Sequence, residues 1–214
     1  MKKFKVGLIR VVTTKDDQIL NAHAKILLNH FPNMEIITRC IPDQLQGIYD
    51  DVTENIAVPK IIDLARNLER EKADAIFISC AADPAVKECR GILKIPVIGA
   101  GSACASLAMG ISDRIGVLGI TEHAPKVFVK MLRDKMIAEI KPEGVNNTLD
   151  LLSVEGEKNT VKAAGILKEK GCDTIALACT GMSTIGIAQV LRDTLQINVI
   201  DPVVAAGFFL RYLS

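Results

Sequence analysis

Two cysteines end matching apolar segments of this chain. Cys80 closes the segment 75–80 and Cys179 closes the segment 174–179, and both segments are rich in aliphatic residues. Short apolar runs of this kind predict buried parallel strands, and α/β folds carry their chemistry at the carboxyl ends of such strands. Two thiols in equivalent positions predict an acid and base pair facing each other across a cleft, in which one thiol removes a proton and the other donates one.

The residues that follow each cysteine predict helix starts. Asp83, followed by a proline, has the character of an N-cap after Cys80, and Thr180 or Ser183 is a candidate cap after Cys179. Gly181 lets the backbone approach a ligand closely. At a helix amino terminus, the free N–H groups and the helix dipole are expected to lower the pKa of each thiol from about 8.5. The same N–H groups can hold a carboxylate or an enolate oxygen.

Further polar candidates lie at the ends of predicted strands. Arg10 ends the first predicted strand, where it either binds a substrate carboxylate with two hydrogen bonds or serves as an ordinary structural arginine. Thr13, Ser102 and Thr121 occupy other strand-end loops. Each of these hydroxyls is a candidate substrate contact or a simple capping residue.

The remaining cysteines and the histidines predict no metal site. The chain has six cysteines and three histidines, with no Cys-x-x-Cys and no histidine at metal-ligand spacing from a cysteine. We therefore expect no bound metal. In a reducing compartment, the four other cysteines are expected to be free packing residues: Cys40, Cys89, Cys104 and Cys172.

Composition and charge exclude several classes of protein. The 214 residues suffice for one large domain or two small ones. Lys and Arg number 26 against 25 Asp and Glu, and their mixture along the chain excludes a basic surface for nucleic acid or for an anionic membrane. The first apolar run is broken by Lys5 and is too short for a signal peptide, and no stretch has the length of a membrane span. These features predict a cytoplasmic protein.

Strand-like and helix-like segments alternate along the chain, which predicts an α/β fold of mostly parallel sheets flanked by helices. Apolar residues at three- and four-residue steps predict a helix over residues 57–70, with Pro59 in its first turn. Residues 141–150 predict a loop because they contain a proline, a glycine and two asparagines. The predicted strands lie near residues 4–12, 34–40, 74–80, 96–99, 114–120, 136–140, 173–179 and 198–200.

An internal duplication relates the two halves of the chain. Three elements recur in the same order at an offset of about 100 residues: 6–8 with 115–117, Cys80 with Cys179, and 95–98 with 197–200. Two similar lobes related by a pseudo-twofold axis would direct both cysteines into the cleft between them, where ligand sites are favoured. The predicted lobes are residues 1–101, on which residues 200–214 pack back, and residues 102–199.

Short motifs surround both cysteines. Ser-Cys-Ala-Ala-Asp-Pro stands at 79–84 and Ile-Pro-Val-Ile-Gly at 95–99, while Ala-Cys-Thr-Gly-Met stands at 178–182 and Val-Ile-Asp-Pro at 199–202. Gly-Ile-Tyr-Asp-Asp occupies 47–51. These motifs resemble the Cys-x-x-Asp-Pro, Cys-Ala-Gly-Met and Gly-x-Tyr-Asp-Glu elements of the aspartate/glutamate/hydantoin racemase superfamily, and most closely its hydantoin racemase branch. The resemblance extends from residue 4 to residue 207.

The resemblance implies an isomerase, a racemase that uses no cofactor, with two lobes and one catalytic cysteine from each. One cysteine, as thiolate, would take a proton from one face of a carbon acid, and the planar carbanion would be held as an enolate. The other cysteine, as thiol, would protonate the opposite face. The resemblance also implies a small-molecule substrate and a homo-oligomer, a dimer or larger.

Departures from the hydantoin racemase pattern leave the substrate open. Residues 10–14 read Arg-Val-Val-Thr-Thr where that branch has Asn-Pro-Asn-Thr, and Ala81 stands where it has an aromatic residue. Thr180 resembles instead the Cys-Thr pair of amino-acid racemases. Candidate substrates are therefore a 5-substituted hydantoin or related cyclic ureide, whose ring delocalises the carbanion charge, and an amino acid such as aspartate or glutamate. Candidate contacts beside the cysteines are Ala81, Thr180 and Gly181.

Two other function classes are compatible with the sequence. A cysteine hydrolase needs a histidine beside its nucleophile, and His123 lies just beyond a predicted strand. A non-catalytic binding module for small molecules would keep its affinity without the thiols and would exchange no proton. A decarboxylase of the same superfamily uses a single cysteine, so the presence of two favours racemisation.

Overall fold

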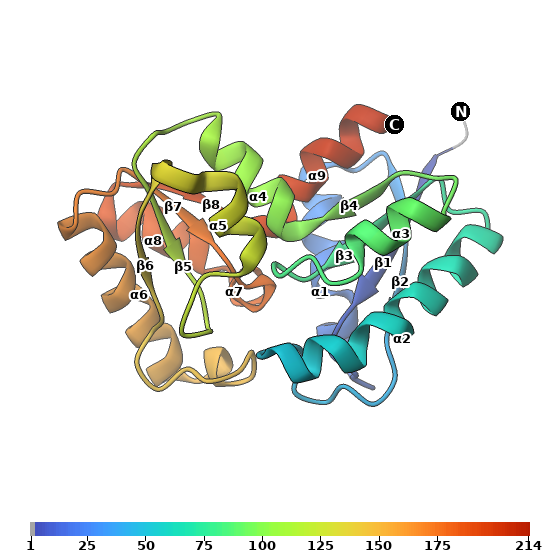
Figure 1. The fold of residues 1–214 in the computed structure, drawn as a ribbon, viewed down its shortest axis with the longest axis horizontal. Coiled ribbons are helices and arrows are strands. Elements are labelled where there is room, and N and C mark those ends of the chain that lie inside the picture. The colour runs from blue at the N-terminus through green and yellow to red at the C-terminus, as the bar shows by residue number, and fades with distance from the viewer. Residues whose placement is uncertain (1–2) are drawn as a thin grey trace.

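Two four-stranded parallel sheets form the framework of the protein (Figure 1). The structure is a computed structural model and describes residues 3–214. The strand order is β2-β1-β3-β4 in the first sheet and β6-β5-β7-β8 in the second, so the two halves repeat one topology. All predicted strands are confirmed: β1 (Phe4–Arg10), β2 (Met34–Cys40), β3 (Ala75–Ser79), β4 (Val97–Gly99), β5 (Ile115–Leu118), β6 (Met136–Ile140), β7 (Thr174–Leu177) and β8 (Asn198–Ile200).

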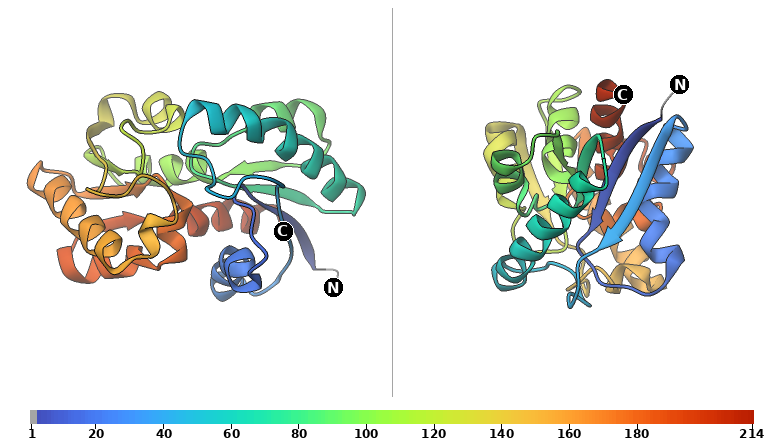
Figure 2. Two further views of the ribbon diagram at one scale, coloured as in Figure 1. Left: turned by 90° about the horizontal axis from the view of Figure 1, so that it is seen from below. Right: turned by 90° about the vertical axis from the view of Figure 1, so that its right-hand side faces the viewer.

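Helices cover both faces of the sheets, as Figure 2 shows for α1 (Asp17–His30) and α2 (Asp51–Arg70) on opposite sides of the first sheet. Two short 3₁₀ turns are η1 (Arg133–Lys135) and η2 (Asp150–Leu152). The helices are α1 (Asp17–His30), α2 (Asp51–Arg70), α3 (Val86–Ile92), α4 (Ala100–Met109), α5 (Lys126–Leu132), α6 (Val154–Glu169), α7 (Thr180–Thr184), α8 (Ile187–Leu195) and α9 (Pro202–Leu213). Within the described residues, no helix is both long and apolar enough to cross a membrane.

The helix predicted over residues 57–70 begins earlier than expected. A capping box starts α2 at Asp51, because the Asp50 carboxylate accepts the N–H of Thr53 at 2.7 Å while the Thr53 hydroxyl oxygen accepts the N–H of Asp50. Pro59 therefore lies inside α2 and not in its first turn. The earlier start carries the amino end of α2 to the region between the sheets.

One glycine in each half shows how closely the lobes repeat one another. A Cβ on Gly7 of β1 would come within 3.1 Å of Leu68 on α2, and a Cβ on Gly116 of β5 would come within 3.0 Å of Leu167 on α6. Each glycine thus lets the equivalent helix pack directly on the first strand of its sheet. The internal duplication is confirmed, because both halves form α/β lobes with the same order of parallel strands.

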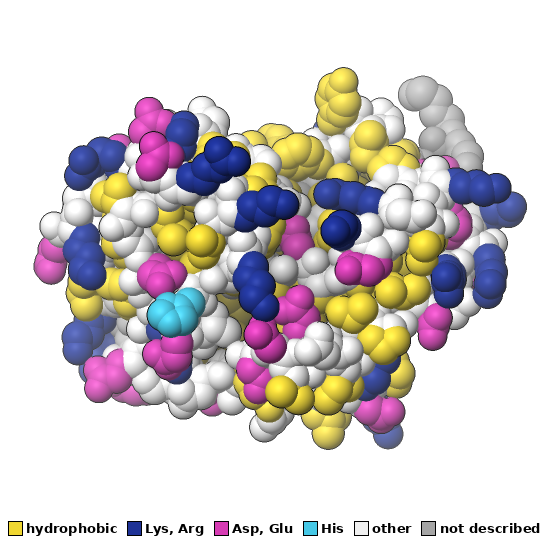
Figure 3. Space-filling view, in the orientation of Figure 1, with side chains coloured by type: hydrophobic (Ala, Val, Ile, Leu, Met, Phe, Trp, Pro, Cys, Tyr) yellow, Lys and Arg dark blue, Asp and Glu magenta, His cyan; other side chains and the backbone are white. Residues whose placement is uncertain are grey.

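The junction between the lobes is built by α4 and α9, which pack on each other. The largest buried cluster crosses this junction, since it includes Phe77 of the first sheet and Ala176 of the second. Gly207 of α9 lies directly against Phe31, and Phe208 stacks edge-on against the same ring at 5.3 Å between centroids. The last helix is thereby attached to α1 of the first lobe. Basic and acidic side chains are interspersed over the face in Figure 3.

Candidate active site

A cavity of about 370 Å³ lies where the carboxyl ends of both sheets meet. Strand ends from both lobes line it, with Arg10 and Ser79 from the first and Ala178 from the second. Cys80 and Cys179 both form part of its wall and are 8% and 7% exposed. The structure thus brings the two cysteines to one site, from segments in different lobes.

Cys80 is held by a turn and not by a helix start. The N–H of Cys80 donates to Ile78 O at 3.0 Å and its carbonyl accepts the N–H of Asp83 at 3.1 Å. The expectation that Asp83 caps a helix directly after Cys80 is wrong, because α3 begins only at Val86 and both Asp83 and Ala85 have positive φ. Turn residues therefore separate this thiol from the helix.

Cys179 does occupy a helix start, as predicted. Cys179 itself is the N-cap residue of α7, in extended backbone conformation, so the expectation that Thr180 or Ser183 caps this helix is wrong, since both lie within it. The backbone N–H groups of Gly181 and Met182 and the side chain of Thr148 act to lower the pKa of its thiol, and the N–H of Met182 donates to Cys179 O at 3.1 Å. These three groups favour the thiolate form of Cys179, whereas one backbone N–H, that of Ala82, acts in the same way on Cys80.

Burial raises the pKa of both thiols. For Cys80, the Ala82 N–H opposes this effect and the charge of Cys179 adds to it; for Cys179, the hydrogen bonds from Gly181, Thr148 and Met182 oppose it. The expected lowering of both pKa values is therefore wrong, since removal of each thiol from water raises its pKa by more than the nearby N–H groups lower it. Both thiols are therefore protonated at neutral pH, and ionisation of Cys179 further opposes ionisation of Cys80, so the thiolate forms more readily on Cys179.

The predicted contacts divide into two groups. Arg10, Ala81, Thr121, Thr180 and Gly181 line the cavity. The structure does not bring Thr13 and Ser102 to the cavity wall. The Thr13 hydroxyl donates to Ile41 O and accepts the N–H of Gln44, while the Ser102 backbone N–H donates to Asp83.

Arg10 is almost completely buried, with 4% of its surface exposed. Its Nη1 donates to Ile19 O at 2.6 Å and to Leu20 O at 3.1 Å, so this nitrogen is engaged by the first turn of α1. Burial lowers the pKa of Arg10 to about 10, which leaves the guanidinium charged at neutral pH. Arg10 therefore supplies a positive charge beneath the cavity wall while serving a structural role.

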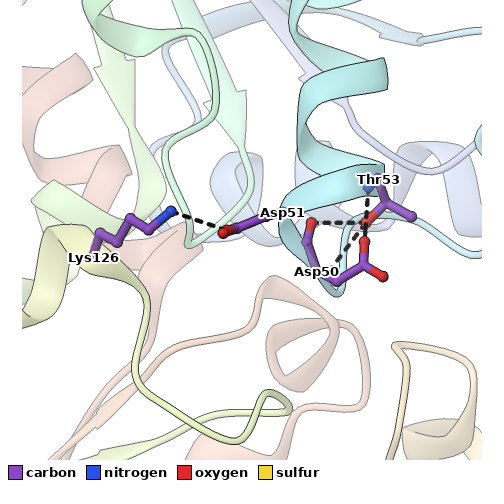
Figure 4. A network of polar contacts seen from close by, with 4 residues as sticks. All are labelled: Asp50, Asp51, Thr53 and Lys126. Carbon is purple, nitrogen blue, oxygen red and sulfur yellow. Dashed lines mark hydrogen bonds and ion pairs between the residues drawn. The ribbon is translucent and has the colours of Figure 1, made fainter.

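An ion pair joins the lobes at the cavity. Lys126 Nζ of α5 lies 3.0 Å from Asp51 Oδ1 at the start of α2, and both residues line the cavity (Figure 4). Glu54 and Asp50 lie on the same side as Asp51. Asp51 belongs to the Gly-Ile-Tyr-Asp-Asp motif, whereas no local sequence signal identifies Lys126 or Thr148.

Neither cavity thiol is paired with a histidine. Within residues 3–214, neither cysteine hydrogen-bonds to a histidine: His23 contacts Ser79 and Thr184, while His123 lines the cavity but its Nδ1 contacts Glu139. The same residues contain no group of three or more His, Cys, Asp or Glu side chains placed to hold a metal ion. The geometry thus lacks the cysteine–histidine pair of a cysteine hydrolase.

These features define a class of protein: a two-lobed α/β enzyme with one buried thiol from each lobe in a shared cavity. The chain belongs to the Asp/Glu/hydantoin racemase family, whose model matches residues 17–207. It is an isomerase of the racemase type.

The comparisons with individual proteins agree with this assignment. The chain is 28% identical to hydantoin racemase of Paenarthrobacter aurescens, over 77% of this chain and 71% of that protein. It is 29% identical to hydantoin racemase of Rhizobium meliloti, over 77% and 69%. The fold is similar to that of allantoin racemase from Klebsiella pneumoniae, with a TM-score of 0.83 and 23% identity over 99% of this chain and 87% of that one.

Proposed function

We propose that the protein racemises a 5-substituted hydantoin or a related cyclic ureide without a cofactor, using Cys80 and Cys179 as its two bases. The observation that carries this proposal is that the two buried thiols come from different lobes and line one cavity. A carbon acid bound between them would have one thiol on each face. This is the arrangement that inversion of a stereocentre requires.

The proposed reaction moves one proton in and one proton out. The thiolate of one cysteine removes the ring proton at the stereocentre, and the electron pair left on carbon delocalises into the neighbouring carbonyl as an enolate. The other cysteine then donates its S–H proton to the opposite face. After one turnover the thiol and the thiolate have exchanged places, so the enzyme is ready for the opposite enantiomer. Proton exchange with water returns the two cysteines to their starting protonation states. The N–H groups at the start of α7 are placed to stabilise an anion beside Cys179.

The charges around the cavity favour a neutral ring over an acidic amino acid. Asp50, Asp51 and Glu54 line it, and Lys126 is paired with Asp51. Aspartate or glutamate would bring two carboxylates, each of which needs a cationic or N–H partner. Arg10 is the observation that supports the amino-acid alternative, since it also lines the cavity, although its Nη1 is engaged by α1.

The proposal is tested with separate enantiomers in deuterated water. Hydantoins, allantoin, aspartate and glutamate are each incubated with wild type, Cys80→Ala and Cys179→Ala. Cys89→Ala is the matched control, since it removes a fully buried thiol of α3 outside the cavity. We expect the wild type and the control to racemise a cyclic ureide with deuterium at the inverted centre, and both single cavity variants to lose racemisation. Full racemisation by either cavity variant would overturn the two-base proposal. Turnover of amino acids alone would overturn the proposal that the substrate is a cyclic ureide.

A further inference from the structure

His23 of α1 is a fully buried histidine whose ring connects the two lobes behind the cysteines. Its Nδ1 lies 2.7 Å from the hydroxyl of Ser79, the residue directly before Cys80. Its Nε2 lies 2.9 Å from the hydroxyl of Thr184, the last residue of α7, which begins directly after Cys179. One imidazole thus contacts the two segments that carry the thiols.

The ring is neutral at ordinary pH. Burial and the nearby charge of Arg10 lower the pKa of His23 well below its usual value. A neutral imidazole has one N–H donor and one acceptor nitrogen. One ring nitrogen therefore donates to its hydroxyl and the other accepts from its hydroxyl, so both nitrogens and both hydroxyls are engaged in either tautomer.

A second bond reinforces the same connection. The Thr180 hydroxyl of α7 donates to Ser79 O at 3.2 Å, also across the lobe boundary. α7 has only five residues, so its placement depends on such contacts more than on its own helical hydrogen bonds. On its other side, Ser183 donates to Asp201 at 2.9 Å.

We propose that His23 is a positioning residue that fixes the placement of the two thiols relative to each other, by joining the residue before Cys80 to the helix after Cys179. This inference rests on the proposed two-thiol function. Neither thiol shares an element or a lobe with the other, so a contact between their segments is needed to define their separation. A displacement of about 1 Å between reacting groups can reduce a rate by about a hundredfold.

The positioning role has a signature that loss of stability does not share. If the thiols move apart, the thiolate on one side still removes the substrate proton, but the carbanion is less often protonated by the other side. The intermediate then returns to the starting enantiomer, which acquires deuterium when the thiol has exchanged its proton with solvent. The ratio of deuterium in the recovered starting enantiomer to inversion therefore rises. A variant that only unfolds more easily loses both processes in proportion.

The test uses one enantiomer of the substrate in deuterated water and compares His23→Gln, Thr184→Val and Leu27→Ala. Leu27→Ala is the control, because Leu27 is a fully buried apolar residue of the same helix. We expect His23→Gln to lower inversion about tenfold or more per folded molecule and to raise the exchange-to-inversion ratio, since one side-chain amide does not reproduce the two ring-nitrogen contacts to Ser79 and Thr184. Thr184→Val should change the ratio in the same direction and carries the test if His23→Gln does not fold. Leu27→Ala should lower the melting temperature with the ratio unchanged.

The test distinguishes failure of the positioning role of His23 from failure of the two-cysteine reaction. A ratio in His23→Gln and Thr184→Val equal to that of Leu27→Ala would overturn the positioning role and leave the two-cysteine reaction intact. Racemisation that persists in Cys80→Ala or Cys179→Ala would instead overturn the proposed function on which the inference rests.

Discussion

The carboxylate of Asp83 accepts the backbone N–H of Gly101 at 2.6 Å, and this bond ties the turn after Cys80 to the first turn of α4. Its other oxygen accepts the N–H of Ser102 at 2.9 Å. The second lobe has a related connection, since Ser183 of α7 donates to Asp201, which caps α9. Each cysteine-bearing segment is thus anchored to the helix that follows the last strand of its own lobe, and these two helices pack together at the junction.

Gly101→Ala should disturb this anchor. A Cβ there would overlap the carbonyl oxygen of Ala81 and lie 2.8 Å from Val127 Cγ1. We expect a loss of about 1–3 kcal/mol in the free energy of unfolding, from overpacking, together with reduced activity because Ala81 follows Cys80. Gly165→Ala in α6 is the matched control, since its Cβ would have only Leu195 at 4.0 Å; it should gain up to about 1 kcal/mol. Urea unfolding measures both, and equal stability of the two variants would contradict the expected crowding.

The raised thiol pKa values predict an alkaline rise in activity. The active form needs one thiolate, and burial raises the pKa of Cys179 above the ordinary range of a cysteine thiol. Below that pKa, the thiolate fraction increases about tenfold per pH unit. We therefore expect kcat/KM to increase about tenfold per pH unit between pH 6 and pH 8, with alkylation of the cavity thiols following the same slope. A plateau beginning below pH 7 would show that the thiolate forms more easily than its burial implies.

Neutral His23 predicts a specific dependence of stability on pH. Its pKa is lowered in the folded state, so below pH 6.5 the unfolded chain takes up a proton that the folded chain does not. The stabilisation is present above pH 6.5 and is lost as pH falls, by up to about 1.4 kcal/mol per pH unit.

The measurement is the difference in unfolding free energy between wild type and His23→Gln from pH 7 to pH 5. Burial raises the pKa of Asp83 and Asp201, which gives a dependence of opposite sign, but both carboxyls are present in both proteins and cancel in the difference. A difference independent of pH would mean that folding leaves the pKa of His23 unchanged, which would contradict its burial as a neutral ring.

Arg10→Met separates the structural role of Arg10 from a role in substrate binding. The substitution removes the buried guanidinium that donates to the Ile19 and Leu20 carbonyls, so we expect a loss of about 1–3 kcal/mol in unfolding free energy. For a neutral hydantoin, KM should stay within about twofold of wild type, since the loss of the Arg10 charge does not weaken the binding of an uncharged ring. A large rise in KM at unchanged kcat would identify Arg10 as a substrate contact.

Lys126→Met tests the charge at the cavity. Lys126 and Asp51 have side chains 87% and 75% exposed, so their ion pair should contribute little to stability. Without Lys126, the carboxylates of Asp51 and Glu54 lose their nearby positive charge. We expect KM to rise for a hydantoin with an anionic side chain and to remain unchanged for one with an alkyl side chain. Asp51→Asn should have the opposite effect on the anionic substrate, and a common response of both substrates would contradict an electrostatic role.

The sequence by itself determined the framework of the protein. All eight strands, the repeated order of the lobes and the strand-end positions of Cys80 and Cys179 follow from short-range patterns. Apolar runs bounded by turn residues are local properties, and parallel strands bring their carboxyl ends to one edge. The start of α7 after Cys179 was predictable for the same reason, since its N–H donors are neighbours in the chain.

The tertiary structure alone decided what surrounds the thiols. Asp83 caps α4 and not a helix of its own segment, because the N–H groups of Gly101 and Ser102 lie beside it only in the folded protein. Burial by both lobes raises the pKa of each thiol, whereas the local N–H groups alone favour a lower value. His23 joins residues 56 and 161 positions away in the chain. No local pattern encodes such contacts, since they depend on how two lobes close against one another.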